Sequence, residues 1–473
     1  MMNVKIGFVP SNWESWDGNA HTGKWAGKMR DRCVDAFRRV PGLELIVPDR
    51  EMTEDGCVST VSEGMRVAEY FRKENIQGLI IGNMTFGMEV AVGALLSSMP
   101  KTMPILHFST PSGPIAENGA RSTDTWCGQF MTASAIKRRG FDFVHLMPAE
   151  PEDEAFLKQI GIFTRAVCAV SRFRGARFGQ IGTRPTLFES EYYSEENMQK
   201  QFSQTVVPMD LATAFSKMDA IKADEPDVKR IVEEIRAGAE IGDVYTEQSI
   251  VNQARYELSL ERIAEELQVQ AIAAACWTQL QERYGISACS TFSRLNEKGV
   301  ITACEADLLG AASMWLMSCA ALGQSKPDFI DWTDRHPTEK NVWLAWHCGN
   351  AASSLRATGC TCKLMRNERM IQWCPNCHGA IEFPLKAGAV TCSRLVEYDG
   401  QYNLFAGTGE VVPIAPYTRG TYGWVKVNDL DDWERKMIDA GVVHHGTLIY
   451  DPLVADALEL AARFLKINFF RGK

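Results

Sequence analysis

The chain has 473 residues, a net charge of −9, 45% hydrophobic residues and 23% charged residues. This length exceeds what one hydrophobic core supports, so two or three domains are expected, and the composition is that of a globular protein in water. The acidic balance argues against nucleic-acid binding, which needs clustered lysine and arginine, and no apolar run is long enough to predict a membrane-spanning helix.

The fourteen cysteines lie mostly in apolar segments and do not form the paired pattern of a small secreted protein. Free cysteine at such positions packs as a small hydrophobic residue. Because no secretory signal is visible before the first predicted strand, we expect reduced thiols and a cytoplasmic location.

The first 150 residues alternate short apolar runs with amphipathic stretches, which is typical of a parallel sheet covered by helices. A helix is predicted at 59–74. Strands are predicted at 4–9, 43–47, 78–82, 104–108 and 141–146. The loops after the first and third strands, "PSNWESWDGN" and "GNMTFGME", should meet at the carboxyl edge of this sheet, but neither has the glycine pattern of a nucleotide-binding loop.

A second α/β pattern follows a polar stretch at 148–156, which indicates a domain boundary. Its predicted elements are strands at 176–182 and 269–276 and helices at 226–239 and 247–267. From about residue 380 the segments become short, rich in β-branched and aromatic residues and separated by glycine and aspartate turns, before a last helix at 452–467. That texture is typical of an antiparallel barrel.

The predicted fold class is therefore α/β, with two doubly wound domains and a barrel. The N-terminal α/β domain is expected at 1–170 and the central α/β domain, which carries Glu305, at 171–325. A C-terminal antiparallel β-barrel-like domain with a terminal helix is expected at 326–473.

The strongest chemical signal is "VITACEADLLGAASM" (300–314), where an apolar strand delivers Glu305 and Asp307 just before an apolar helix. Residues two apart in an extended segment share a face. Asp307 is in a position typical of a helix cap. Glu305 is set between two apolar runs, and a carboxylate is seldom buried there without a partner or a metal.

Two further segments carry candidate ligands. Asp331 follows the short apolar pair "FI", and His347 ends the run "VWLAW". "GVVHHG" (441–446) is the only place where two of the eight histidines are adjacent, and the pair suits either a functional site or a polar strand end. Carboxylates together with imidazoles favour Mn²⁺ or a similar divalent ion over a structural zinc.

These segments resemble the L-fucose isomerase and L-arabinose isomerase superfamily. The resemblance is carried by "ACEADLLGAASM" around Glu305, by "FIDW" and "WHCGNAA" around Asp331 and His347, and by "VVHHGTLIYD" around His445. "FPLKAGAVTCSRL" (383–395) is similar to the C-terminal barrel of fucose-isomerase-like proteins. The resemblance covers most of the chain in architecture and is specific in its motifs from about residue 276 onward.

The resemblance implies a metal-dependent aldose–ketose isomerase acting on a pentose or hexose. Glu305 and Asp331 would be the catalytic acid/base pair, and together with His445 and His347 they would bind Mn²⁺ or another divalent ion. Of the adjacent histidines, His445 would face the metal and His444 would point to the other face of its strand.

The resemblance and the aromatic residues also suggest substrate contacts and an assembly. Asn350 and Trp424 are expected to contact the sugar, and Trp13, in a loop that also holds Trp16 and Trp25, could stack on it or belong to an interface. A homo-oligomer such as a hexamer is implied, in which the N-terminal domain of a neighbouring subunit completes the active site.

Aldose–ketose interconversion needs residues of these types. A proton must leave C2 and return to C1 through a cis-enediol, and two carboxylates can exchange the roles of base and acid. A divalent ion can stabilise the developing charge, and an imidazole holds the ion without adding negative charge. The alternatives are a non-catalytic sugar-binding or regulatory protein, since doubly wound domains also build such proteins, and a metal-dependent sugar epimerase.

The N-terminal loops depart from the fucose isomerase pattern. "VPSNWESWDGN" lacks the arginine that fucose isomerases present there, and "GNMTFGME" has Met and Thr where that family uses an aromatic residue. The positions that contact the sugar therefore differ, and L-fucose itself is not the expected substrate.

A cysteine-rich segment, "GCTCKLMRNERMIQWCPNCHG" (359–379), suggests a second metal. A CxC pair followed by a CxxC pair is similar to the ligand spacing of a zinc ribbon. Two interpretations are open: a structural Zn²⁺, or thiols of a generally cysteine-rich chain. A redox CxxC is less expected, because no predicted helix begins after Cys377 to lower the pKa of a thiol. The candidate ligands are Cys360, Cys362, Cys374 and Cys377.

Overall fold

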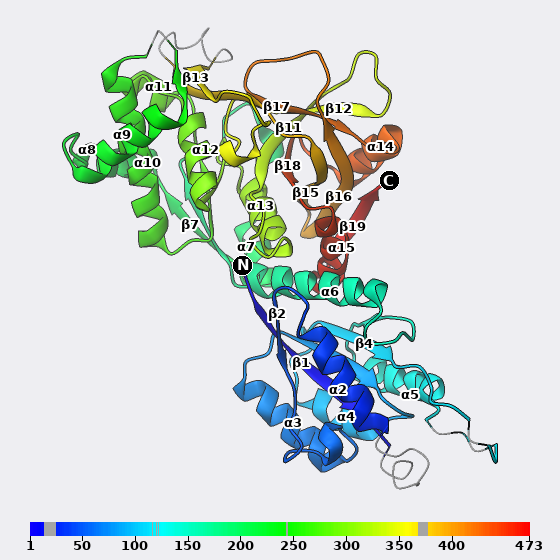
Figure 1. The fold of residues 1–473 in the computed structure, drawn as a ribbon. Coiled ribbons are helices and arrows are strands. Elements are labelled where there is room, and N and C mark those ends of the chain that lie inside the picture. The colour runs from blue at the N-terminus through cyan, green and yellow to red at the C-terminus, as the bar shows by residue number, and fades with distance from the viewer. Residues whose placement is uncertain (14–24, 116, 120, 122, 243–244, 368–376) are drawn as a thin grey trace. The chain divides into compact units, whose positions relative to one another are not determined.

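The computed structural model describes residues 1–13, 25–115, 117–119, 121, 123–242, 245–367 and 377–473. The chain forms two compact units, Met1–Ser171 and Arg172–Lys473 (Figure 1). No helix in the described part of the chain is long and apolar enough to cross a membrane.

The first unit is a five-stranded parallel sheet with the order β2-β1-β3-β4-β5, as the alternating pattern predicts. Its strands are β1 (Val4–Ser11), β2 (Leu43–Ile46), β3 (Gly78–Asn83), β4 (Ile105–Ser109) and β5 (Val144–His145). Its helices are α2 (Trp25–Phe37), α3 (Val61–Lys73), α4 (Glu89–Ser97), α5 (Thr125–Arg138) and most of α6 (Glu154–Phe173).

Local sequence signals explain where α3 begins. The Thr60 hydroxyl accepts a hydrogen bond from Glu63 N at 3.2 Å, and the Glu63 carboxylate accepts one from Thr60 N at 2.9 Å. This capping box satisfies two backbone donors at the helix start. The helix predicted at 59–74 is therefore confirmed to within about two residues.

The second unit begins with a four-stranded parallel sheet in the order β10-β9-β6-β7. Its strands are β6 (Arg177–Ile181), β7 (Thr205–Met209), β9 (Ala271–Ala274) and β10 (Ile301–Ala303). The helices of this part are α7 (Glu195–Phe202), α8 (Leu211–Ala220), α9 (Pro226–Gly238), α10 (Glu247–Leu267), α11 (Gln279–Tyr284), α12 (Cys289–Lys298) and α13 (Leu308–Ala320).

Six antiparallel strands of the second unit close into a barrel, in the order β16-β15-β18-β11-β12-β17 with β17 pairing back to β16. They are β11 (Asp328–Arg335), β12 (Val342–His347), β15 (Gly388–Tyr398), β16 (Gln401–Val412), β17 (Thr421–Lys426) and β18 (His445–Ile449). The predicted barrel is confirmed. The strands β8 (Glu240–Ile241), β13 (Lys363–Arg366), β14 (His378–Pro384) and β19 (Asn468–Gly472) extend this sheet, and the helices α14 (Leu430–Ala440) and α15 (Leu453–Leu465) accompany it.

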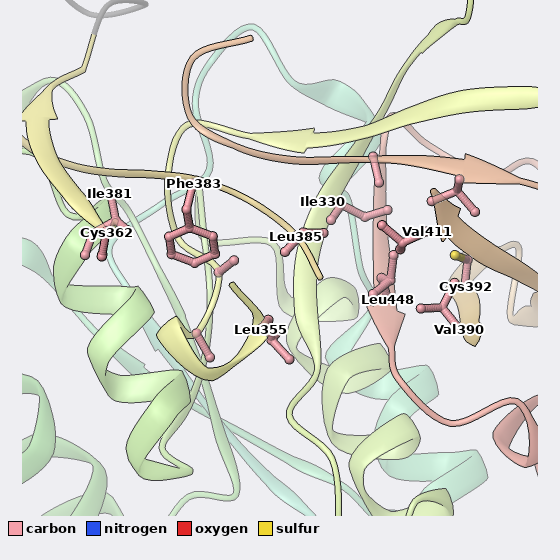
Figure 2. Packing of buried hydrophobic residues seen from close by; sticks show 14 of the residues in the cluster. Ile330, Leu355, Cys362, Ile381, Phe383, Leu385, Val390, Cys392, Val411 and Leu448 are labelled. Atoms are coloured by element: carbon pink, nitrogen blue, oxygen red, sulfur yellow. The ribbon is translucent and has the colours of Figure 1, made fainter. Parts of the chain in front are cut away.

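The hydrophobic core of the barrel decides which strand residues are available for chemistry. Ile330 of β11 and Leu448 of β18 are buried in this core with Val390 and Val411, as Figure 2 shows. Because side chains alternate along a strand, Asp331 and His445 point to the opposite face. On that side α13 packs against β15 and β18, so the end of the parallel sheet and the barrel enclose a common space within one unit.

Candidate active site

Glu305 comes from the tight turn between β10 and α13. Both Glu305 and Ala306 have left-handed backbone conformations, with φ of 60° and 58°. Non-glycine residues in this region cost about 1–3 kcal/mol each, and such strain is concentrated at functional sites. The turn brings Glu305 Oε2 to 3.1 Å from His445 Nε2, while Trp277 Nε1 donates a hydrogen bond to Oε1 at 3.2 Å.

Asp331 reaches the same imidazole from the barrel. In the antiparallel pairing of β11 and β18, Asp331 is directly opposite His445, so their side chains share a face. Asp331 Oδ1 lies 3.7 Å from His445 Nε2 and has no hydrogen-bond partner among the described residues. Two carboxylates from distant parts of the chain therefore approach one nitrogen atom.

The other imidazole nitrogen of His445 is held by a buried ion pair. His445 Nδ1 donates to Asp307 Oδ2 at 2.9 Å, and Arg394 binds both oxygens of Asp307, with Nη2 to Oδ1 at 2.9 Å. Asp307 also caps α13 by accepting from Gly310 N at 2.9 Å, as predicted. This carboxylate–histidine arrangement fixes the ring and directs Nε2 toward Glu305 and Asp331.

Glu191 adds a fourth carboxylate to the cluster. Its side chain is buried, its Oε1 lies 3.5 Å from His445 Nδ1, and neither oxygen has a hydrogen-bond partner among the described residues. Burial, reinforced by the negative charge of Asp307, raises the pKa of Glu191 to about 9. Glu191 is therefore protonated and uncharged at neutral pH.

His347 completes the set of potential donors. Its ring lies 6.1 Å from that of His445, between centroids, and its Nδ1 has no hydrogen-bond partner in the described part of the chain. Donor atoms of Asp331, His347 and His445 lie within 4.8 Å of one another, as do those of Glu191, Glu305, His444 and His445. Burial lowers the pKa of His347, which keeps the imidazole neutral and able to act as a ligand.

The charges around His445 fit a divalent cation. Arg394 compensates Asp307, because burial alone would raise the pKa of Asp307 but the charge of Arg394 holds it well below its usual range. Glu305 and Asp331 then leave two negative charges facing one nitrogen. An octahedral ion with bonds of about 2.1 Å separates neighbouring donors by about 3 Å, which is close to the 3.1 Å between Glu305 and His445.

A proton competes for the same place. Burial alone would lower the pKa of His445, but its hydrogen bonds to Asp307 and Glu305 outweigh burial and raise the pKa to about 10. Glu305 shows the complementary effect, since burial would raise its pKa but the hydrogen bond from His445 lowers it. A cation that binds Nε2 would displace this proton.

A cavity of ≈ 210 Å³ opens beside the carboxylates. Its lining includes the titratable side chains of Glu305 and His347 and the aromatic rings of Phe188 and Trp277. The Phe188 and Trp277 ring centroids are 6.1 Å apart. Apolar walls around a few charged groups are the usual composition of a small-molecule site.

The adjacent histidines have different surroundings. His445 is buried in the cluster, whereas His444 is exposed and lines a second cavity with Trp332. The two rings are nevertheless adjacent, with centroids 3.9 Å apart. Gly446 completes the motif, because a Cβ at this position would lie 2.3 Å from the Trp332 ring, whose Nε1 donates to His445 O at 3.1 Å. His445 belongs to the ligand set as predicted, but the prediction that His444 points to the other face of the strand is wrong, because its ring packs beside that of His445 and reaches the same carboxylates.

The three predicted sugar contacts, Trp424, Trp13 and Asn350, stay predictions. Trp424 is buried in a cluster with Val342, Leu344 and Tyr422, and its Nε1 donates to Pro416 O at 2.8 Å, so it is not on the cavity wall. Trp13 belongs to the first unit, where its ring packs 5.0 Å from Phe86. Trp16 lies outside the described residues.

Asn350 is fully buried, and its side-chain amide has no hydrogen-bond partner among the described residues. It is not among the residues that line the cavity beside Glu305, so its predicted contact with the sugar stays a prediction.

The structure does not bring together the predicted zinc ligands that it describes. In the β13–β14 hairpin Lys363 pairs with Glu382 and Arg366 with His378, so Cys362 and Cys377 flank opposite ends. Five strand positions separate them along the hairpin, which is roughly 16 Å. One ion cannot bind both thiols in this arrangement. Cys374 lies outside the described residues, and Cys360 is not part of any group of potential metal ligands in the described chain.

Sequence reasoning missed several residues of this site. Arg394, Glu191 and Trp277 were not among the candidates, and Asp307 was expected only as a cap. One signal for Arg394 was available, because it is a charged residue within the apolar strand segment "AVTCSRLVEY". A buried arginine needs a carboxylate partner. Nothing in the local sequence of Glu191 or Trp277 marks either residue.

Comparisons with known proteins find one matching family description and several relatives that span most of the chain. The family description "Fucose/sulfoquinovose isomerase, N-terminal domain" matches residues 20–174. The sulfoquinovose isomerase of Priestia aryabhattai is 26% identical over 411 residues, which cover 85% of this chain and 87% of the relative. The sulfoquinovose isomerase of Alkalicoccus urumqiensis is 25% identical over 367 residues, 77% of this chain and 79% of the relative.

These matches confirm the predicted resemblance to the fucose-isomerase-like superfamily. The chain is an enzyme, an isomerase of the aldose–ketose type. The non-catalytic alternative is set aside.

Proposed function

We propose that this enzyme is a divalent-metal-dependent isomerase that interconverts sulfoquinovose, a hexose with a sulfonate at C6, and the corresponding ketose through a cis-enediol. The observation that carries the proposal is the approach of Glu305 and Asp331 to a single nitrogen of His445, 3.1 Å and 3.7 Å away, while Asp307 and Arg394 hold the ring from behind.

Glu305, Asp331 and His445 would hold the ion, with His347 as a further neutral donor, and Mn²⁺ suits this set of carboxylate and imidazole ligands. The residues fit such an ion because Asp331 Oδ1 and His347 Nδ1 are buried without hydrogen-bond partners in the described part of the chain. When bound, the ion supplies Lewis acidity that stabilises negative charge on the sugar oxygens.

The side chains then divide the proton transfer. One of the two carboxylates, Glu305 or Asp331, takes the proton from C2 and gives it to C1, while the other moves a proton from O2 to O1, so that both are regenerated in each turnover. Trp277 orients Glu305 through the hydrogen bond to Oε1. The neutral Glu191 keeps the buried cluster from accumulating a further negative charge.

The substrate class rests on the relatives and on the departures from the fucose pattern. The relatives that span most of this chain carry the name sulfoquinovose isomerase. The first-strand loop lacks the arginine of fucose isomerases, which is consistent with a sugar other than L-fucose. A homo-oligomer with the site completed by a neighbouring subunit, and a cytoplasmic location, belong to the same proposal.

The test is an assay of the purified enzyme with Mn²⁺ in D₂O against sulfoquinovose, D-glucose, L-fucose and L-arabinose, followed by NMR. We expect ketose formation and exchange of the C2 proton with sulfoquinovose in preference to the other sugars. Exchange without ketose would favour the epimerase, and no exchange with any sugar would contradict the proposed reaction.

Glu305→Gln supplies the matched variant for this assay. It should retain the fold and lower the turnover rate by about 10²–10⁴-fold, because the amide cannot take up a proton. Glu434→Gln makes the same chemical change in an exposed ion pair with Arg335 and should leave the rate unchanged. A Glu305→Gln protein with wild-type turnover would exclude Glu305 as the acid/base.

A further inference from the structure

Four free cysteines line the cavity beside Glu305, and the proposed reaction uses none of them. They are Cys276, Cys289, Cys304 and Cys348. Two of them are in contact, with the Cys276 and Cys304 sulfur atoms 3.3 Å apart. A thiol is only a weak hydrogen-bond partner for a polar substrate, but it is a good ligand for a soft metal ion. The grouping therefore suggests a ligand that binds sulfur.

The topology of the parallel sheet explains why these two thiols meet. Cys276 follows β9 and Cys304 follows β10, and the two strands pair in parallel, with Ala273 opposite Ala303. The carboxyl ends of neighbouring parallel strands lie at the same edge of the sheet. Cys304 directly precedes Glu305, so the same edge presents two sulfur atoms and one carboxylate.

We propose that Cys276, Cys304 and Glu305 form a second metal site, specific for a soft divalent ion of the Zn²⁺ or Cd²⁺ class. One ligand atom from each of the three residues lies within 4.8 Å of the other two. Because Glu305 is shared with the His445 cluster, an ion at the thiol site withdraws this carboxylate from the isomerisation. The inhibitory consequence, but not the binding, rests on the proposed function.

The spacing of the sulfur atoms suits a tetrahedral ion. With metal–sulfur bonds of about 2.3 Å, two thiolates on one tetrahedral centre lie roughly 3.8 Å apart. The observed 3.3 Å needs a shift of only about half an ångström, which χ1 rotation of either cysteine provides. Two thiolates and one carboxylate supply three ligands, and the adjoining cavity leaves the fourth position open.

Ligand softness separates the two sites. Thiolates select zinc-like ions, whereas a set of carboxylates and imidazoles suits Mn²⁺. On binding, each thiol gives up its proton to solvent and its sulfur becomes a ligand, so one ion displaces two protons. A zinc-like ion would then bind at the thiols and Mn²⁺ at the carboxylates and imidazoles. The two ions would compete for Glu305, which both sites share.

The binding test is a titration of Cd²⁺ into the full-length enzyme, kept reduced with a phosphine and stripped of metal with a chelator. Thiolate-to-cadmium charge transfer in the ultraviolet reports sulfur ligation without any assay of activity. We expect Cys276→Ser/Cys304→Ser to lose one cadmium equivalent and its share of the absorbance. The matched control, Cys33→Ser/Cys57→Ser, also removes two buried thiols but should bind as the wild type does.

A second experiment measures inhibition of the Mn²⁺-loaded enzyme by Cd²⁺. For the wild type and each variant, it determines the Cd²⁺ concentration that halves the rate measured without Cd²⁺. We expect at least a tenfold increase in that concentration for Cys276→Ser/Cys304→Ser and none for the control. An equal number of cadmium ions and equal absorbance in the wild type and in Cys276→Ser/Cys304→Ser would overturn the proposal.

The two proposals fail separately. Cadmium bound through thiolates by a protein that isomerises no sugar would contradict only the proposed function, and an active isomerase without the thiolate signal would contradict only the second site. If the double variant does not fold, as judged by circular dichroism, Cys276→Ser alone must still reduce the absorbance of the bound cadmium by half.

Discussion

Two parts of this protein carry predicted metal ligands, and the structure arranges them in opposite ways. The ligands around His445 come from the parallel sheet and from two barrel strands far apart in the sequence, yet two carboxylates lie within 3.7 Å of one nitrogen. The cysteines of the 359–379 segment are close in sequence, yet Cys362 and Cys377 flank opposite ends of a hairpin.

The difference shows that the pairing register of the strands, rather than the spacing of residues in the sequence, decides which ligands lie together. Asp331 meets His445 because β11 and β18 pair in that register, and Glu305 meets His445 because α13 packs on the barrel. In the hairpin the same kind of pairing separates the thiols. The comparison also shows how a buried charge is tolerated, since Arg394 compensates Asp307 next to the site.

The largest effect on stability is expected from breaking the buried ion pair between Asp307 and Arg394. Asp307→Asn leaves Arg394 buried without a charged partner, which should lower the free energy of unfolding by about 3–5 kcal/mol. It also releases the His445 ring, which should weaken Mn²⁺ binding by about 10–100-fold. Urea denaturation and isothermal titration calorimetry measure the two quantities.

Glu434→Gln is the control for this variant, because it removes a partner of Arg335, whose side chain is 52% exposed. A change within about 1 kcal/mol is expected there. If both variants lose the same stability, the buried ion pair is not what distinguishes the site.

The next largest effect is expected at Asp328, a buried carboxyl group of the barrel that has no arginine partner in the described part of the chain such as Arg394 provides for Asp307. Burial raises the pKa of Asp328 to about 8, and its Oδ1 has no hydrogen-bond partner among the described residues. The folded state keeps this proton up to about pH 8 whereas the unfolded chain loses it near pH 4, so the stability contributed by Asp328 falls as the pH rises through this window.

Asp328→Asn should therefore be more stable than the wild type at pH 9, by a few kcal/mol, and should lose much of the decline between pH 4 and pH 8. Thermal unfolding followed over that range measures the effect. A variant whose stability falls with pH as steeply as that of the wild type would show that Asp328 is ionised in the folded state.

A smaller effect is expected at the motif that carries the two histidines. Gly446→Ala places a methyl group where the Trp332 ring lies, at 2.3 Å, and overpacking of this kind costs about 1–3 kcal/mol. Gly238→Ala, at the end of α9 where nothing lies within 4 Å of the added methyl, should be neutral or stabilising by up to about 1 kcal/mol. Equal stabilities of the two variants would argue against the close approach of Trp332.

The smallest effect concerns the cysteine hairpin. Cys362 is buried in the hydrophobic core beside Ile381 (Figure 2). Cys362→Ser should therefore leave the zinc content of the purified enzyme unchanged. Elemental analysis after purification without added metal is the measurement. Loss of one zinc per chain in this variant would show that the hairpin rearranges to bind the ion.

Local patterns in the sequence determined most of the architecture. Alternating apolar runs predicted the two parallel sheets, the helix expected at 247–267 is α10 with the same bounds, and turn-rich β segments predicted the barrel. These features depend on side-chain periodicity and caps within a few residues, which a single sequence displays. The family motifs likewise pointed to Glu305, Asp331, His347 and His445 as candidate ligands, and the structure brings donor atoms of Asp331, His347 and His445 close together.

Only the tertiary structure decided which of these residues act together. It placed Glu191 beside His445 and Arg394 on Asp307, and it buried Trp424 outside the cavity lining. It also separated Cys362 from Cys377 and brought the Cys276 and Cys304 thiols into contact. Each outcome depends on strand register or on the packing of one element on another. Strand register and packing are fixed by how the core is filled across the whole unit. No short stretch of the sequence therefore contains this information.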